Sequence, residues 1–273
     1  MTFVIPETGD TALAQQFVDW VATATWKDSR EYLTAHAGTL LTAPAEAALQ
    51  QLIDENPDHQ VLALHQWILA GARAEGVEAA YDALEESLHF RALTETLVAW
   101  VTTQSWDEAH AFFEAHQDES LTDEAESVLA ALATDNPEQP DLLAHQGLLA
   151  LCRIDGSEKA YLLLSDIDRL RGLIASPAGQ KYPVRALPRA RLLAGLFPED
   201  PEAVLALALA AMREGDREGM ELAIGRCVAM TGPSLRREFA RRLGELADTE
   251  PDLAPVLRVL EGVFRKSSED TPS

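Results

Sequence analysis

The sequence repeats itself at an offset of 80 residues, and this duplication limits the possible folds more than any other feature does. Residues Phe17–Leu84 align without a gap on Leu97–Leu164, with 26 identities in 68 positions. The matches include tryptophans, histidines and an Asn-Pro pair at one fixed offset, which a shared composition would not produce. We therefore expect the two copies to adopt the same arrangement of elements.

Within each copy the apolar residues recur at helical spacing, and no segment shows the alternation that is typical of a strand. Thr25 and Ser105 each stand three residues before a carboxylate, which is the capping box of a helix start. The expected helix boundaries in the first copy are Thr25, Thr42, the Asn56-Pro57 pair and Gly76, with a further helix around Tyr81. The pattern predicts an all-α protein.

The pattern changes after Asp168, where glycines and several prolines interrupt the helical spacing. Beyond Pro201 it resumes as a helix, a Gly-Asp turn, a second helix and two more helices. The predicted organisation is an N-terminal segment with the start of the first helix (1–16), two repeat copies (17–96 and 97–168), a loop-rich connection (169–200), a helical module (201–265) and a mobile polar tail (266–273).

The chain carries a formal charge of −23, and this charge is unevenly distributed. Residues 1–165 contain 28 acidic and 6 basic residues, whereas residues 166–273 contain 17 acidic and 16 basic residues. Because DNA and RNA repel so acidic a chain, we expect no nucleic-acid binding. The longest uninterrupted apolar run has nine residues, and no secretory signal is readable, so we expect a cytoplasmic protein that binds no membrane.

The segment from Pro201 to Val228 resembles a tetratricopeptide repeat. The residues that carry the resemblance are Pro201, Leu207 and Ala208 in the first helix and the Gly215-Asp216 pair at the turn. The segment departs from that repeat at Met220, where a small alanine is preferred.

The two 80-residue copies resemble the helical repeats that accompany caspase-like CHAT domains in some bacterial proteins. The matching residues are Trp26, Tyr32-Leu33, His36, Leu41-Thr42 and Glu46, and in the second copy Trp106, Phe112-Phe113, His116, Leu121-Thr122 and Glu126. No segment resembles the protease domain itself. The two resemblances imply a superhelical, TPR-like array of helix hairpins that serves as a protein-interaction scaffold.

Histidine often carries catalysis, but the apolar pattern around two histidines of this sequence predicts that they are core residues. His65 and His145 occupy the same apolar stripe in the two copies, and a residue needed once in an active site has no reason to be duplicated. Asp107 and His110 have the spacing of a helical metal site, but the first copy has basic residues at these positions. We expect no metal site and no cofactor.

Cys152 and Cys227 lie in apolar helical patterns and are expected to be free thiols in the core. The sequence contains no His-x-x-x-His pair, no Gly-x-Ser-x-Gly elbow and no glycine-rich phosphate loop. We therefore expect a protein that is not an enzyme.

Three sets of residues are candidates for binding a partner. Trp67 is the first, because its counterpart in the second copy is Gly147 and the repeat framework therefore requires no indole there; idiosyncratic core packing is the alternative. The second set consists of the carboxylates Asp118, Glu119, Asp123, Glu124 and Glu126, and the third of the arginines Arg236, Arg237, Arg241 and Arg242. Either charged set is also consistent with a solvated helix face, and the arginines with docking onto an acidic surface of the same chain or of a second subunit in a homodimer.

The predicted function is non-enzymatic protein–protein recognition, as a scaffold or adaptor whose acidic surface binds a partner with a basic segment. The alternative is a regulatory protein that binds a peptide or small ligand between its modules, and an α-helical enzyme is a third hypothesis. A deep pocket with convergent polar groups would favour the regulator, and an open acidic groove would favour the scaffold.

Overall fold

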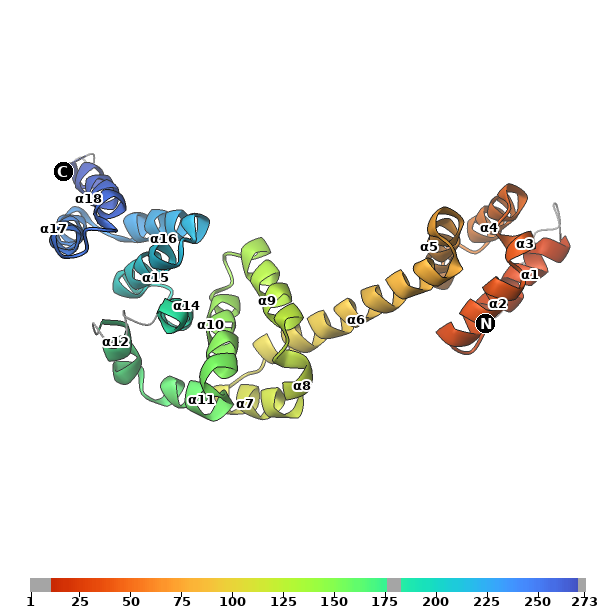
Figure 1. Cartoon of the computed structure of the whole chain (residues 1–273), viewed down its shortest axis with the longest axis horizontal. Coiled ribbons are helices and arrows are strands. Elements are labelled where there is room, and N and C mark those ends of the chain that lie inside the picture. Colours follow the sequence, from red (N-terminus) through yellow and green to blue (C-terminus); the bar gives the residue numbers. More distant parts are fainter. Residues whose placement is uncertain (1–10, 176–182, 270–273) are drawn as a thin grey trace. The chain divides into compact units, whose positions relative to one another are not determined.

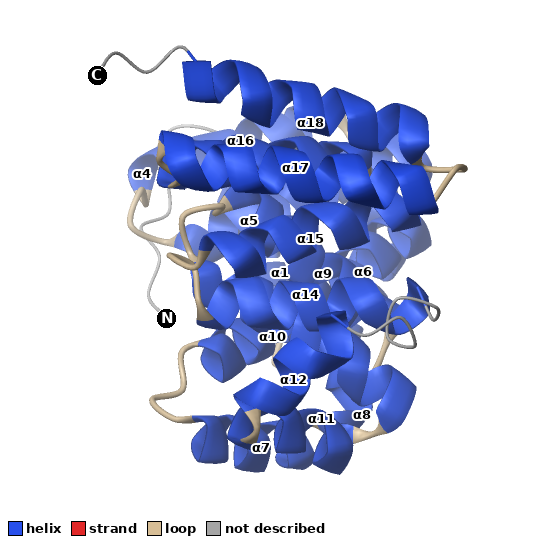
Figure 2. Cartoon of the chain, turned by 90° about the vertical axis from the view of Figure 1, so that its left-hand side faces the viewer, coloured by secondary structure: helices blue, strands red, loops and turns tan. Residues whose placement is uncertain are grey.

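The structure is a computed structural model that describes residues 11–175 and 183–269. These residues form 17 helices. Figure 2 shows no strand among them. The all-α prediction is therefore confirmed for the described part of the chain. The helices pack in pairs, and most pairs are neighbours in the sequence (Figure 1).

The helices group into two compact units, which divide within helix α6 between Ala92 and Leu93. The first unit contains α1 (Thr11–Val21), α2 (Trp26–Ala35), α3 (Ala37–Leu40), α4 (Ala43–Glu55), α5 (Gln60–Glu75) and the first part of α6 (Val77–Val101). The second unit contains the end of α6, α7 (Trp106–Ala115), α8 (Gln117–Ser120), α9 (Asp123–Asp135), α10 (Pro140–Asp155), α11 (Ser157–Ser165), α12 (Ile167–Ala175), α14 (Pro183–Leu196), α15 (Pro201–Glu214), α16 (Arg217–Met230), α17 (Pro233–Thr249) and α18 (Ala254–Glu269).

The two repeat copies have the same helices at the same places, as predicted. Helices α2, α3, α4 and α5 coincide with α7, α8, α9 and α10 after a shift of 80 residues. The end of α6 corresponds to α1, and α11 corresponds to the beginning of α6. The copies differ after this point, because α11 ends at Ser165 whereas α6 continues to Val101.

The predicted helix caps are present. The hydroxyls of Thr25 and Ser105 accept hydrogen bonds from backbone N–H groups three residues later, and Thr42 and Thr122 do the same at α4 and α9. The glycines that end α5 and α10 both have positive φ, where glycine is favoured. The short helices α3 and α8 were not predicted.

The structure corrects two expectations. Segment 169–200, expected to be loop-rich, contains most of α12 and all of α14, which holds Pro188 in its interior. Packing of α14 on α10 and α15 stabilises the helix in spite of this proline. Helix α18 continues to Glu269, so residues 266–269 of the expected tail are helical, while 176–182 and 270–273 lie outside the described residues.

Helices α10 and α14 approach each other closely. A Cβ atom on Gly147 of α10 would lie 2.4 Å from the carbonyl oxygen of Pro188, and one on Gly195 of α14 would lie 2.4 Å from the backbone nitrogen of Ala144. Real Cβ atoms do not come so close to backbone atoms. The contact therefore requires glycine at both positions.

The carboxyl-terminal module begins with the predicted pair of helices joined by a Gly-Asp turn. Gly215 has a φ of 76°, and the carboxylate of Asp216 accepts a hydrogen bond at the start of α16. Met220 packs at the edge of the core of this module. Helices α17 and α18 pack together around the rings of Phe239 and Phe264, whose centroids are 5.7 Å apart.

The close contact predicts opposite effects of two glycine substitutions. Gly147→Ala should lower the free energy of unfolding by about 1–3 kcal/mol, because α10 and α14 must separate to admit the methyl group. Gly225→Ala is the matched control, since a Cβ there meets open space, and it should raise stability by about 0.5–1 kcal/mol. Urea unfolding measures both variants, and effects of the same sign would contradict the described packing.

Candidate functional site

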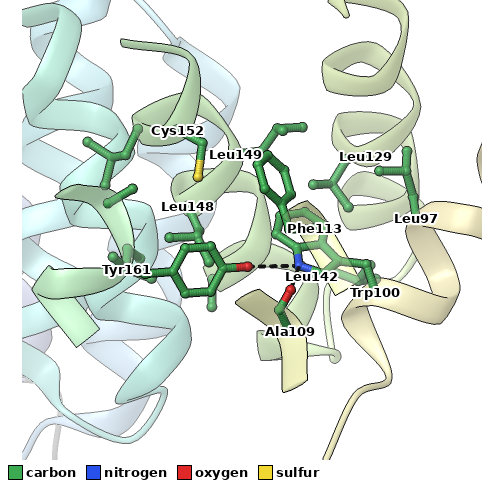
Figure 3. Packing of buried hydrophobic residues seen from close by; sticks show 14 of the residues in the cluster. Leu97, Trp100, Ala109, Phe113, Leu129, Leu142, Leu148, Leu149, Cys152 and Tyr161 are labelled. Atoms are coloured by element: carbon green, nitrogen blue, oxygen red, sulfur yellow. Dashed lines mark hydrogen bonds between the residues drawn. The ribbon is translucent and has the colours of Figure 1, made fainter. Parts of the chain in front are cut away.

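Each repeat copy buries a network of aromatic rings around one tryptophan. In the second copy the indole N–H of Trp100 donates hydrogen bonds to the carbonyl oxygen of Ala109, at 3.1 Å, and to the hydroxyl of Tyr161, at 3.0 Å (Figure 3). The ring of Phe113 lies beside the indole, at 5.2 Å between centroids. The network joins α6, α7 and α11 in the interior of the unit.

The first copy contains the same network. The indole N–H of Trp20 donates to the carbonyl oxygen of Ser29 and to the hydroxyl of Tyr81, both at 3.1 Å. Trp20 and Trp100 are fully buried, whereas Trp26 and Trp106 are half-buried. Because a buried indole N–H must find an acceptor, the tyrosine satisfies a requirement of the core in both copies.

His65 and His145 complete these networks as the buried core residues that the sequence predicts. Each imidazole lies edge-on to the buried tryptophan, at 4.6 Å, and its Nδ1 donates to the backbone carbonyl four residues earlier. Burial lowers the pKa of both side chains, that of His145 to about 4. Both imidazoles are therefore neutral at pH 7.

Cys152 and Cys227 are free and buried, as predicted. Burial raises the pKa of each thiol to about 12. Since the thiolate is the reactive form of cysteine, these side chains act as apolar core groups at pH 7.

Trp67 is exposed, with 47% of its surface accessible, and is therefore not a core residue. Its counterpart Gly147 lies under α14, so the two copies differ in what covers this face of the helix. We call Leu64, Trp67, Ala70 and Glu75 the open face of α5. Their counterparts on α10, which are Ala144, Gly147, Ala150 and Asp155, are all less exposed.

The predicted carboxylates differ in their surroundings. All five lie on α8 or in the first turn of α9, and they are Asp118, Glu119, Asp123, Glu124 and Glu126. Arg153 of α10 forms ion pairs with Asp123 and Glu126, so these two hold α9 against α10. Asp118 and Glu119 are exposed and have no ion-pair partner among the described residues.

The four predicted arginines of α17 have different surroundings. Arg236 donates hydrogen bonds to the carbonyl oxygens of Val228 and Ser267, which ties α17 to α16 and α18. Arg241 pairs with Glu245 and Arg242 with Glu202. Arg237 is exposed. Their ion pairs are thus with acidic residues of the carboxyl-terminal module, and not with the carboxylates of the second copy.

A pocket of about 240 Å³ lies between α11, α12 and α14, beside Asp155 at the end of α10, and is open to solvent. Its lining residues are Asp155, Lys159, Leu162, Leu163, Arg169, Leu173, Arg185 and Arg189. Arg185 binds Asp155 through two nitrogens, with Nη2 at 2.7 Å from Oδ1, and this contact lowers the pKa of Asp155. Among residues 11–175 and 183–269 no carboxylate lies within ion-pair distance of Lys159, Arg169 or Arg189.

A second pocket, of about 340 Å³ between α12, α14, α15 and α17, is different in this respect. Its three arginines each have a carboxylate partner, the pairs being Arg171 with Asp200, Arg213 with Glu250 and Arg242 with Glu202. The sequence does not predict the first pocket, because the glycines and prolines of segment 169–200 indicate a loop. The available signal was the spacing of Arg185 and Arg189, four residues apart in a region rich in arginine.

Comparisons of this chain with protein-family models, with curated proteins and with solved structures found no match. The described side chains include no group of three or more His, Cys, Asp and Glu residues that could hold a metal ion. None of the described helices has the length and apolar character that a membrane crossing requires.

Acid should destabilise the protein through His145. Burial lowers its pKa from 6.5 to about 4, so the unfolded chain takes up this proton first as the pH falls. The contribution of the neutral His145 to the free energy of unfolding is complete above pH 6.5. This contribution is lost as the pH falls from 6.5 to about 4, by about 3 kcal/mol in all. Urea unfolding near pH 7.5 and pH 4.5 should show a smaller loss in His145→Leu than in the wild type. Parallel pH profiles would contradict the assignment.

Proposed function

We propose that this chain is a non-enzymatic protein-interaction scaffold and that the open face of α5 binds a helix of its partner. A superhelical, TPR-like array of helix hairpins is part of this proposal. The observation that carries it is the difference between the two copies: the same helix face is covered by α14 in one copy and left exposed in the other.

The contact between α10 and α14 supports the proposal, because it shows within the same chain how a helix packs on this face of a repeat. Helix α14 covers α10 with apolar residues, and its Arg185 forms an ion pair with Asp155 at the end of α10. Glu75 occupies the position of Asp155 on α5, is exposed, and has no ion-pair partner among the described residues. A partner helix with apolar residues on one face and a basic residue near one end would therefore match the open face.

Trp67 changes the way in which such a helix can bind. At Gly147 the backbones of α10 and α14 nearly touch, but the indole of Trp67 holds a partner helix farther from α5. The partner must therefore receive the indole in a gap between its own side chains. Tryptophan in such a position contributes more to binding energy than most residue types do.

The charge of the first unit supports a basic partner. Residues 11–92 contain 12 acidic and 4 basic residues. An acidic surface accelerates encounters with a basic segment, and this effect weakens as salt screens the charges. The carboxylates Asp118 and Glu119 of the second unit are the competing location for the same interaction.

The alternative function is a ligand-responsive regulator, and one observation favours it. The pocket between α11, α12 and α14 has convergent charged groups and apolar walls, which is the arrangement of a small-molecule site. All residues that line this pocket belong to the second unit, and none of them belongs to the open face of α5. The two functions are therefore separable by experiment.

Trp67 should dominate the binding of helical peptides. Amphipathic helical peptides that contain arginine are selected by display on the full chain, and their affinities are measured by fluorescence anisotropy. Trp67→Ala should weaken binding by about 30-fold or more, as for a central interface residue, and should leave the melting temperature unchanged because the side chain is exposed. Leu222→Ala, an exposed apolar residue of α16, is the matched control and should have no effect. Equal affinity of the Trp67→Ala variant and the wild type would overturn the proposal.

Salt should slow the association of these peptides more than it changes their dissociation. The screening length falls from about 10 Å at 0.1 M to about 3 Å at 1 M, so the association rate should decrease over this range. Glu75→Gln should reduce this salt dependence, whereas the double variant Asp118→Asn, Glu119→Asn should not. Stopped-flow measurements test this, and the reverse result would place the interaction on α8.

A further inference from the structure

The pocket between α11, α12 and α14 collects positive charge in a strongly acidic protein. Its lining contains one lysine and three arginines against the single carboxylate of Asp155. That carboxylate is held by Arg185 through two nitrogens. Three cations, Lys159, Arg169 and Arg189, are left to face the pocket without a carboxylate partner among the described residues.

The segment that joins α12 to α14 adds no acidic residue to the sequence of this region. Residues 176–182, between α12 and α14, have the sequence SPAGQKY, which contains no Asp or Glu. The three arginines of the neighbouring pocket each have a carboxylate partner, unlike Lys159, Arg169 and Arg189.

Arg189 is the cation of this pocket whose hydrogen bonding and charge are least satisfied. Its Nε atom is buried and has no hydrogen-bond partner among the described atoms. Burial lowers the pKa of this guanidinium, and the charges of Arg185 and Arg169 act in the same direction, while Asp155 opposes them. An anion in the pocket would relieve both the repulsion between the guanidinium groups and the missing hydrogen bond.

We infer that this pocket binds a small phosphate monoester whose phosphate lies among Lys159, Arg169 and Arg189 and whose organic part lies against the leucines. A monoester carries about −1.5 to −2 charges at pH 7 and three strong acceptor oxygens, which suits three cations better than a single carboxylate does. Guanidinium groups bind such oxygens through paired N–H donors.

The size and walls of the pocket restrict the ligand. A volume of about 240 Å³ is smaller than the roughly 300–1,000 Å³ of pockets for drug-sized molecules, so the ligand has a phosphate and a short organic group. Leu162, Leu163 and Leu173 line the same space and offer apolar contact. The inference goes beyond the proposed scaffold function, because none of these residues belongs to the open face of α5.

The test is calorimetric titration of the full chain with n-butyl phosphate, inorganic phosphate and pentanoate at constant ionic strength. Butyl phosphate should bind at one site and more tightly than inorganic phosphate, and pentanoate should bind more weakly than either. Arg189→Gln and Arg169→Gln should each weaken the binding of butyl phosphate by about tenfold or more, the loss of a charged hydrogen bond. Arg169 is exposed, so its variant keeps the test valid if Arg189→Gln does not fold.

Two further variants locate the site. Arg217→Gln removes an exposed arginine of α16 with the same change in charge, and it should leave the affinity for butyl phosphate unchanged. Leu162→Ser should weaken binding of butyl phosphate but not of inorganic phosphate. The inference is overturned if butyl phosphate shows no saturable binding, if pentanoate binds equally well, or if the Arg169 and Arg189 variants bind like the wild type.

Discussion

The contact between Gly147 of α10 and the backbone of α14 is the constraint on which the two candidate sites depend. A side chain at this position would meet the carbonyl oxygen of Pro188, so α14 can lie on α10 only because the residue is glycine. Once α14 lies there, Arg185 reaches Asp155, and Arg189 joins Lys159 and Arg169 around one pocket. The same position in the first copy is Trp67, and that face of α5 is exposed.

Comparison of the two copies distinguishes the residues that both cores require from the residues that are particular to one copy. The buried tryptophan, its tyrosine partner and the neutral histidine are present in both copies with nearly the same distances, because each copy has to satisfy the same indole N–H in the same core. Trp67 and Gly147 take no part in satisfying this indole N–H, so the two copies can differ at this position. The change of residue coincides with a difference in structure, since α6 continues as one helix where α11 ends and is followed by α12 and α14.

Local patterns in the sequence are sufficient to predict most of the helices, but they do not predict the candidate sites. The caps at Thr25 and Ser105 and the buried role of His65 follow from contacts within one repeat, which periodicity reveals. Helix α14 did not follow, because Pro188 and the flanking glycines suggest a loop and only packing on α10 stabilises the helix. The basic pocket is assembled from four helices, and Arg236 is used to bind backbone carbonyls, so neither could be read from residue spacing.

Fluorine NMR of protein labelled with 5-fluorotryptophan can show whether the open face of α5 receives a helix through Trp67. The chain has five tryptophans, and Trp67→Phe identifies the resonance of Trp67. Binding of a helical peptide on this face should shift the Trp67 resonance, while the resonances of the buried Trp20 and Trp100 should stay in place. An unchanged Trp67 resonance at saturating peptide would contradict binding on this face.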